Sequence, residues 1–297
     1  MRRIHWIAFS LLCALSGTSW AIQDKMDGLP VLERQGILFG AIGLIASLLA
    51  RRKAWMRRGR GWYVQVSVAA VGLYGLPIVI GEYSREYVAG NVRGALYAMV
   101  PVVVVLAVAA GSGGEERGVR RFLVPALAGV GGLLLLLPLS FSKTIGGWVM
   151  LFVICTTVVL VGVMSVWLYR LLPDGELDVE FAVLGFANAA FLLGWSAVHE
   201  DMVWRASGLA SVVSVSSFVD VVEVLLIVWL LRVMPPVRFA SRYLLIPLLT
   251  VVEGFFVVRP DLTVRIVSGT VLLAAGAGVL LFFDAESPGS PLVQFPL

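Results

Sequence analysis

Long apolar runs, separated by short stretches that hold charges, Pro or Gly, dominate this sequence. Runs such as 96–110 and 149–168 are almost continuously apolar and do not alternate with polar residues. Only helices and closed β-barrels satisfy their backbone hydrogen bonds inside a lipid bilayer, and barrel strands alternate. With 59% hydrophobic and 14% charged residues, the chain also lacks the polar surface of a soluble globule. The sequence therefore predicts an all-α integral membrane protein whose main partner is the lipid bilayer.

Ten of these runs have roughly the 17–25 residues that a membrane-spanning helix needs. The predicted spans are 4–22, 32–50, 62–81, 91–110, 120–138, 146–168, 179–197, 211–231, 240–257 and 264–283. The connections between them are short, so we expect no inserted soluble domain. The segment 285–297 has the composition of a disordered tail.

The distribution of Lys and Arg predicts the orientation of the spans. With the N-terminus in the cytoplasm, 15 of the 23 basic residues fall on the cytoplasmic side, the densest group lying between 51 and 60. Short cytoplasmic loops are enriched in Lys and Arg. We therefore expect a protein of the plasma membrane, the inner membrane in bacteria, with both termini in the cytoplasm. Because the basic residues lie between apolar runs, the net charge of +4 does not indicate nucleic-acid binding.

The first span has an alternative interpretation. Arg2 and Arg3 precede an apolar stretch, and Ser19-Trp20-Ala21 has the pattern of a small-residue cleavage site, as in a secretory signal peptide. The stretch 4–22 is nevertheless close to a spanning length, and the next helix follows in regular alternation. We therefore expect it to be retained as the first helix.

A repeat at an offset of 146 residues divides the predicted helices into two halves of five, over 1–141 and 142–284. The matching positions are Tyr97 with Tyr243, Pro101 with Pro247, Glu115 with Asp261, Gly132 with Gly278, and the glycine-rich run 128–132 with 274–278. Because five is odd, the second half would enter the membrane upside down relative to the first, which is the inverted-repeat plan of many secondary transporters. Chance matches among the Pro, Gly and Ala residues of apolar helices are the alternative.

In these features the chain resembles the drug/metabolite transporter superfamily, in particular its EamA-type members. The resemblance rests on the pattern of a Pro, an apolar run, an acidic residue and a glycine-rich helix, which occurs twice. The stretch 16–30 is similar to the family's first helix and loop, although Trp20 follows Gly17 here, whereas the family has the Trp before the Gly.

The resemblance implies a ten-helix transporter with a central cavity that opens alternately to either side of the membrane. Its substrate would be a small metabolite or an amphipathic compound. Coupling to protons is a separate hypothesis, which rests on Asp220 and Glu223. A non-transporting membrane scaffold or lipid-interacting protein that keeps this fold is the alternative. The sequence has no nucleophile elbow, phosphate-binding glycine loop or HExxH motif, so we expect neither an enzyme nor a cofactor. The oligomeric state is left open.

Asp220 and Glu223 are the foremost candidate site residues. They are three residues apart in the eighth predicted span, hence on one face of a helix and near its middle. Ionisable groups at membrane depth are expensive, and two close carboxylates could share a proton or hold a cation. Pairing with an Arg or a hydroxyl group inside the bundle is the structural alternative.

Other candidates are a carboxylate, an arginine and several aromatic or amide side chains within the predicted spans. They are Tyr97, Tyr243, Trp20, Tyr74, Asn188, Trp195, Glu253 and Arg93. The aromatic and amide groups could line a cavity or simply pack. Glu253 could reach the interface, while Arg93 and Arg242 could meet an anion or anchor helix ends.

Two smaller groups of residues could carry chemistry but are given structural roles. Cys13 and Cys155 lie within apolar runs and are expected to be small buried side chains. His199, Glu200 and Asp201 are adjacent and therefore converge poorly on one ion, so we expect a solvated loop and no metal site.

Overall fold

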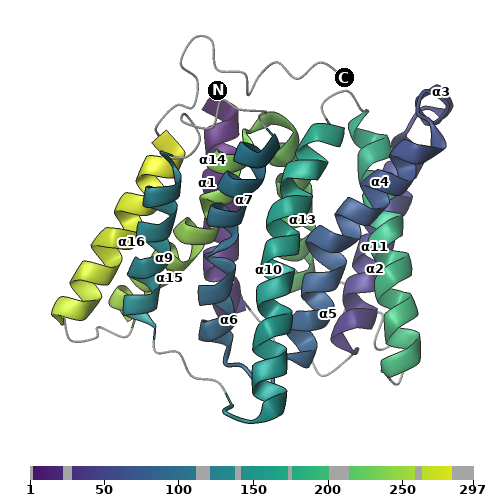
Figure 1. Cartoon of the computed structure of the whole chain (residues 1–297). Coiled ribbons are helices and arrows are strands. Elements are labelled where there is room, and N and C mark those ends of the chain that lie inside the picture. The colour runs from purple at the N-terminus through teal and green to yellow at the C-terminus, as the bar shows by residue number, and fades with distance from the viewer. Residues whose placement is uncertain are drawn as a thin grey trace. The chain divides into compact units, whose positions relative to one another are not determined.

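The computed structural model of this protein is built from helices, as the sequence predicts (Figure 1). It describes residues 3–22, 29–111, 121–137, 142–172, 176–200, 214–257 and 263–282, and no strand occurs among them. The helices are α1 (Arg3–Ile22), α2 (Val31–Leu49), α3 (Arg52–Trp55), α4 (Arg60–Ala70), the π-helix η1 (Val71–Gly75), α5 (Leu76–Tyr83), α6 (Gly90–Tyr97), α7 (Val100–Gly111), α9 (Leu123–Leu136), α10 (Ile145–Leu171), α11 (Leu177–His199), α13 (Val215–Val233), α14 (Pro236–Ala240), α15 (Arg242–Val257) and α16 (Val264–Phe282).

Seven helical stretches within the described residues are long and apolar enough to cross a membrane. They are Val31–Leu49, Arg60–Tyr83, Val92–Gly111, Ile145–Leu171, Leu177–His199, Pro236–Phe256 and Val264–Phe282. Each coincides with a predicted span. The other three predicted spans fall on α1, on α9, which is a shorter apolar helix, and on α13, which carries Asp220, Glu223 and Arg232. The prediction of ten spans and of an inverted repeat therefore stays a prediction.

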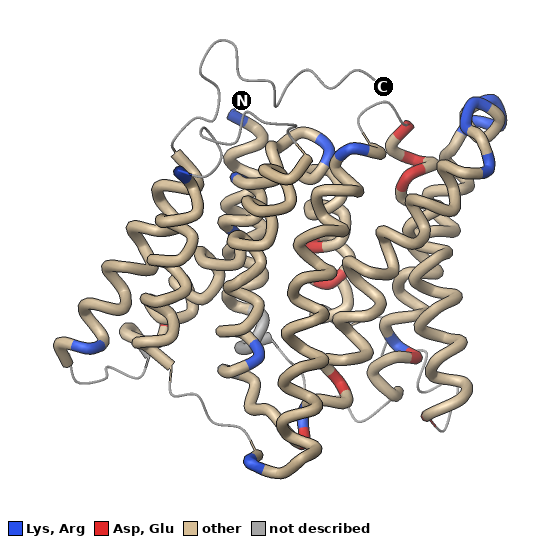
Figure 2. The backbone as a smooth tube through the Cα atoms, viewed as in Figure 1, with Lys and Arg blue, Asp and Glu red and all other residues tan. Residues whose placement is uncertain are grey.

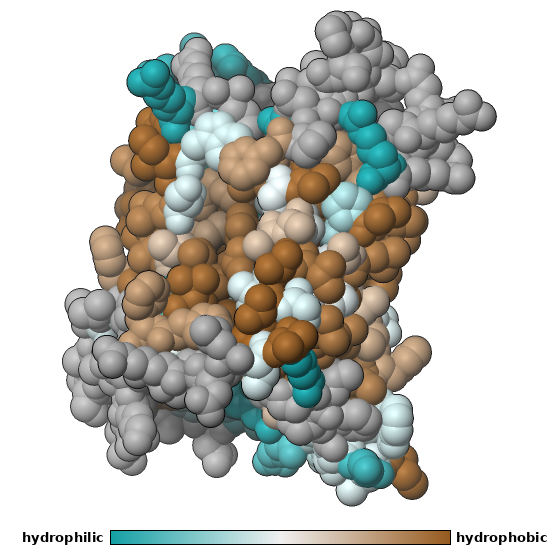
Figure 3. Space-filling view, turned by 90° about the vertical axis from the view of Figure 1, so that its left-hand side faces the viewer, coloured by the Kyte–Doolittle hydropathy of each residue, from teal (hydrophilic) through white to brown (hydrophobic). Residues whose placement is uncertain are grey.

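Apolar side chains cover the helices where lipid would surround them. On the face drawn in Figure 3, hydrophobic residues predominate over the middle of the helices, and hydrophilic residues gather toward their ends. Large side chains such as Leu48, Phe152 and Phe256 are more than 70% exposed. Such exposure is unfavourable in water but is the expected surface in hydrocarbon.

Proline explains two of the helix interruptions. Pro101 has no backbone N–H to donate to the carbonyl of Tyr97, and the helix is broken between α6 and α7, at Ala98 and Met99. Pro236 instead begins α14, a position where the missing N–H is harmless. The predicted fourth span is thus divided into α6 and α7, whereas Pro247, which the repeat matches to Pro101, lies inside the continuous helix α15.

The chain packs as two compact units that interleave along the sequence. Unit 1 contains Met1–Tyr83 and Trp167–Val233, and unit 2 contains Ser84–Val166 and Met234–Leu297. The predicted halves, 1–141 and 142–284, describe a duplication in the sequence and are not tested by this division. Each unit takes helices from both predicted halves.

In unit 1, α2 and α11 form the most extensive helix pair. Gly43 lies against the backbone of Gly185. A Cβ atom added to Gly185 would lie 2.5 Å from the Gly43 nitrogen. Farther along, Gly36 faces Leu193 and Gly40 faces Ala189. Small residues allow two helix backbones to approach closely, which is how membrane helices gain packing contacts. α1 packs on α13 in the same unit.

In unit 2, α9 and α16 form the corresponding extensive pair. A Cβ atom on Gly276 would lie 2.6 Å from the Gly129 nitrogen, and one on Gly132 would lie 2.6 Å from the Gly269 carbonyl oxygen. The glycine-rich runs that match at the offset of 146 residues therefore pack against each other in space.

Candidate functional site

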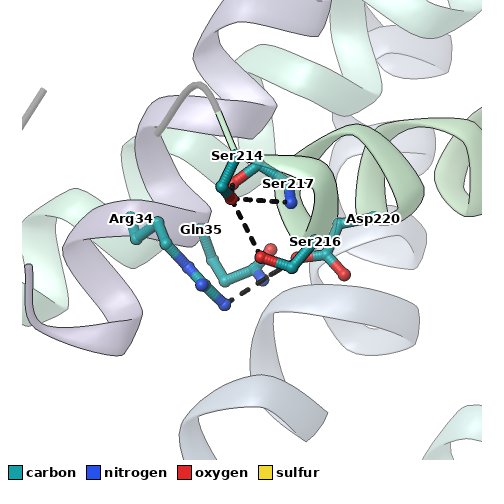
Figure 4. A network of polar contacts seen from close by, with 6 residues as sticks. All are labelled: Arg34, Gln35, Ser214, Ser216, Ser217 and Asp220. Atoms are coloured by element: carbon teal, nitrogen blue, oxygen red, sulfur yellow. Dashed lines mark hydrogen bonds and ion pairs between the residues drawn. The ribbon is translucent and has the colours of Figure 1, made fainter. Parts of the chain in front are cut away.

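Asp220 joins α13 to α2 inside unit 1 (Figure 4). Gln35 Nε2 donates a hydrogen bond of 2.8 Å to Asp220 Oδ2, and Arg34 Nη2 lies 3.9 Å from the same oxygen. The side chains of Arg34 and Asp220 are 24% and 35% exposed. We call Arg34, Gln35 and Asp220 the Asp220 cluster. It ties the first turn of α2 to the second turn of α13.

The position of Asp220 corrects the sequence prediction, which placed it near the middle of its span. α13 begins at Val215, and the hydroxyl group of the preceding Ser214 caps it by accepting a hydrogen bond from the Ser217 N–H. Asp220 therefore lies near the N-terminus of this helix. Glu223, one turn later, is half-buried and nearer the middle. Both partners of Asp220 in the Asp220 cluster belong to α2, with the Gln35 amide closer than the Arg34 guanidinium group.

Serine hydroxyl groups surround the start of α13 beside Asp220 (Figure 4). Ser214 Oγ accepts a hydrogen bond of 3.2 Å from the Ser217 backbone N–H and donates one of 3.0 Å to Ser217 Oγ. It also lies 2.9 Å from Ser216 Oγ. Such bonds satisfy the unpaired N–H groups of a helix N-terminus. This end of α13 is consequently polar.

Glu180 and Arg232 form a second ion pair at the other end of α13. Arg232 Nη1 lies 3.6 Å from Glu180 Oε2, while Glu180 itself is fully buried in the first turn of α11. Neither carboxylate oxygen of Glu180 has a hydrogen-bond partner among the described residues. We call these two residues the Glu180 pair. Twelve residues separate Asp220 from Arg232, so the two polar contacts are about 18 Å apart along α13.

Sequence reasoning missed Glu180 because it closes an acidic stretch that looks like a solvated loop. A signal was available in the residues that follow. Val179, Ala182, Val183 and Leu184 are all buried with it. An acidic residue that shares a turn with such a continuous apolar run belongs to the helix rather than to the loop.

An open pocket of about 660 Å³ adjoins the Glu180 pair. Its lining residues are Leu49, Arg51, Glu176, Leu177, Asp178 and Arg232. One of its charges is already neutralised, because Arg57 Nη1 lies 3.0 Å from Glu176 Oε1. Figure 2 shows the basic residues of α3 and acidic residues near the start of α11 at this same end of unit 1.

Tyr74 and Asn188, two predicted cavity residues, lie in the part of unit 1 where α11 packs on η1. Tyr74 belongs to η1, and its ring meets Phe39 edge-on at 5.8 Å. Asn188 is fully buried and donates to the Leu184 carbonyl, whereas its Oδ1 has no hydrogen-bond partner among the described residues. A Cβ atom on Gly75 would lie 2.9 Å from this oxygen. π-Helical turns occur often at functional sites.

Trp195 lies in an aromatic group at the end of α11. Its Nε1 donates to the Tyr83 hydroxyl at 3.2 Å, and its ring stacks on His199 at 4.7 Å. His199 is the last residue of α11 and is exposed, rather than part of a loop as predicted. No group of three potential metal ligands occurs within the described ranges, which exclude Asp201.

Tyr97 and Tyr243, which the repeat matches in sequence, stack on each other in unit 2. Their ring centroids are 6.5 Å apart with an angle of 17° between the planes. Arg242, at the start of α15, is buried. Its guanidinium group lies 4.0 Å from the centroid of the Phe239 ring, and its Nη2 lies 2.9 Å from the Tyr243 hydroxyl. Arg93 Nη1 lies 3.4 Å from Ser84 Oγ in the same unit.

The remaining predicted residues contribute less. Glu253 is half-buried on α15, and the side chain of Trp20 lies outside the described residues. Cys13 is buried as predicted, but Cys155 is exposed. The prediction for Cys155 was wrong because an apolar run fixes depth in the membrane and not which side of the helix faces lipid.

Comparison with known proteins identifies the fold but names no activity. No protein-family model and no curated protein matches the chain. The crystal structure of another protein shares the fold, with a TM-score of 0.68 and 19% sequence identity over 95% of this chain and 99% of that one. At this identity the likeness shows the fold alone.

Proposed function

We propose that this protein is a secondary transporter that works by alternating access. The observation that carries the proposal is that ion pairs join α13 to its neighbours at both of its ends. Arg34 of α2 meets Asp220 at one end, and Glu180 of α11 meets Arg232 at the other. Charged pairs inside membrane helices are costly to assemble and mark pathways for ions or substrates.

One member of each ion pair occupies an equivalent position in the predicted repeat, whereas the other members, Asp220 and Arg232, both lie on α13. Arg34 and Glu180 are 146 residues apart, which is the offset found in the sequence, and each is the fourth residue of its helix. In an inverted repeat, equivalent positions lie on opposite sides of the membrane. One pair could then open as the other closes. The stacking of Tyr97 on Tyr243 supports the same symmetry, since residues near a two-fold axis meet their own equivalents.

The basic residues near α3 predict on which side of the membrane each ion pair lies. By the positive-inside rule they belong in the cytoplasm, together with the pocket and the Glu180 pair. The Asp220 cluster then lies at the outer ends of α2 and α13. In this arrangement the pocket of unit 1 lies on the cytoplasmic side, and both ion pairs are formed.

A ligand screen followed by a transport assay tests the proposal. Purified protein is screened by thermal unfolding against classes of small metabolites, because a ligand that binds the native state stabilises it. Compounds that stabilise the protein are then followed into proteoliposomes. Uptake above that of protein-free vesicles is expected. Binding without uptake, or no stabilising compound at all, would favour the alternative of a scaffold with a transporter fold.

Proton coupling is a separate hypothesis for the same assay. We expect Asp220→Asn and Glu223→Gln to reduce substrate-driven proton movement, measured with a pH-sensitive dye inside the vesicles. If both variants and their combination leave it unchanged, neither carboxylate couples protons.

A further inference from the structure

We infer that the pocket beside the Glu180 pair binds an organic carboxylate and that binding transfers a proton to Glu180. The inference deepens the proposed function by treating this anion as the cargo, but the binding reaction does not itself require transport.

The lining of the pocket selects the ligand. Arg51 and Arg232 present two guanidinium groups, Leu49 and Leu177 present apolar walls, and Glu176 and Asp178 add two carboxylates. Glu176 is engaged by Arg57, which reduces the negative charge that faces a ligand. A carboxylate matches the planar fork of a guanidinium group, and an apolar body fits against the leucines. A volume of about 660 Å³ is ample for a small aromatic or aliphatic acid.

Arg232 connects the pocket to a carboxylate that is held weakly. It lines the pocket and is also the ion-pair partner of Glu180, but at 3.6 Å the contact is longer than a hydrogen bond. Both Glu180 oxygens are buried without a hydrogen bond among the residues described. An incoming carboxylate that forms two short hydrogen bonds with Arg232 would therefore displace Glu180 from it.

Displacement makes the proton transfer necessary. A buried carboxylate that loses its cation is strongly destabilised, and it regains stability by protonation. The other charged groups near Glu180 are Arg58, just before α4, Arg51 in the pocket lining, Asp178 on its own helix and Glu176 at the cap of that helix. The charges balance on binding. The ligand remains an anion paired with Arg232, and the Glu180 carboxylate takes up one proton from water through the pocket. One anion and one proton thus enter together.

Proton uptake on binding tests the inference. Benzoate is titrated into the purified protein in weakly buffered detergent solution slightly above neutral pH, and the heat of binding and the pH change are followed together. Benzamide, which has the same ring without the charge, is the control ligand. We expect benzoate to bind with uptake of about one proton per site, and benzamide to cause none.

Variants separate the two parts of the inference. Glu180→Gln should bind benzoate without proton uptake, whereas Arg232→Gln should weaken binding by about tenfold or more. Arg232→Lys provides a milder change if the first variant does not fold. Arg60→Gln, an exposed residue at the same end that does not line the pocket, should behave like the native protein.

Three results would overturn the inference: no preference for benzoate over benzamide, binding without proton uptake, or uptake that persists in Glu180→Gln. Failure of the proposed function looks different. In that case benzoate binding and proton uptake are present, but neither benzoate nor any other stabilising compound crosses the proteoliposome membrane.

Discussion

At the scale of single residues, the two ion pairs of α13 differ in burial and should differ in energy. Arg34 and Asp220 are both partly exposed, and Gln35 shares the carboxylate. Glu180, by contrast, is fully buried and its described ionic partner is Arg232. Partly exposed pairs contribute little to stability, whereas breaking a buried pair leaves an uncompensated charge.

We therefore predict that Glu180→Gln destabilises the protein more than Asp220→Asn does. The loss should be about 2 kcal/mol for Glu180→Gln, below the value for a fully buried pair because Arg232 faces the pocket, and under about 1 kcal/mol for Asp220→Asn. Thermal unfolding in detergent measures both. The double variant Glu180→Gln/Arg232→Gln should recover part of the loss. Equal losses in the two single variants would contradict this ranking.

At the scale of helices, the close approach of α2 and α11 depends on glycine. A Cβ atom on Gly185 would meet backbone atoms of Gly43 and Phe39 within 2.7 Å, and backbone cannot easily move aside. One on Gly40 would meet only the Ala189 Cβ atom, at 3.6 Å, which is an ordinary contact. An alanine substitution should thus be costly at Gly185 and tolerated at Gly40.

We predict that Gly185→Ala lowers the free energy of unfolding by about 1–3 kcal/mol through overpacking, while Gly40→Ala changes it little. The measurement is the midpoint of thermal unfolding for each purified variant. In unit 2, Gly276→Ala and Gly278→Ala form the same contrast, because Gly276 meets the Gly129 backbone and Gly278 faces open space. Tolerance of Gly185→Ala would mean that the two helices do not pack this closely.

The sequence predicts features that depend on neighbouring residues, but not contacts between helices that are far apart in the chain. Seven spans could be predicted because length and apolarity are local properties. The interruption before Pro101 could also have been anticipated from the missing N–H. The pairing of Asp220 with Arg34 could not, because it depends on which way two separate helices turn. The burial of Glu180 was missed because it depends on the residue at which the helix begins, and the sequence does not fix that residue.

At the scale of the whole molecule, the orientation in the membrane decides the direction in which the pocket opens. We predict that a cysteine replacing Arg52 reacts with a membrane-impermeant maleimide from the cytoplasmic side, and one replacing Glu86 from the outside. Both positions are exposed. Labelling in intact cells and in inside-out vesicles, in a background without Cys13 and Cys155, gives the two accessibilities. The reverse pattern would invert the assignment of the pocket.

The most direct test of the account is whether the two ends of α13 open reciprocally. Cysteines at Ser216, beside the Asp220 cluster, and at Leu177, in the pocket, report the two ends when labelled from either side of the membrane. The account predicts that Asp220→Asn increases labelling at position 216 and decreases it at position 177, and that Glu180→Gln does the opposite. If the two positions instead change in the same direction, or one changes without the other, the two ion pairs are not alternating gates.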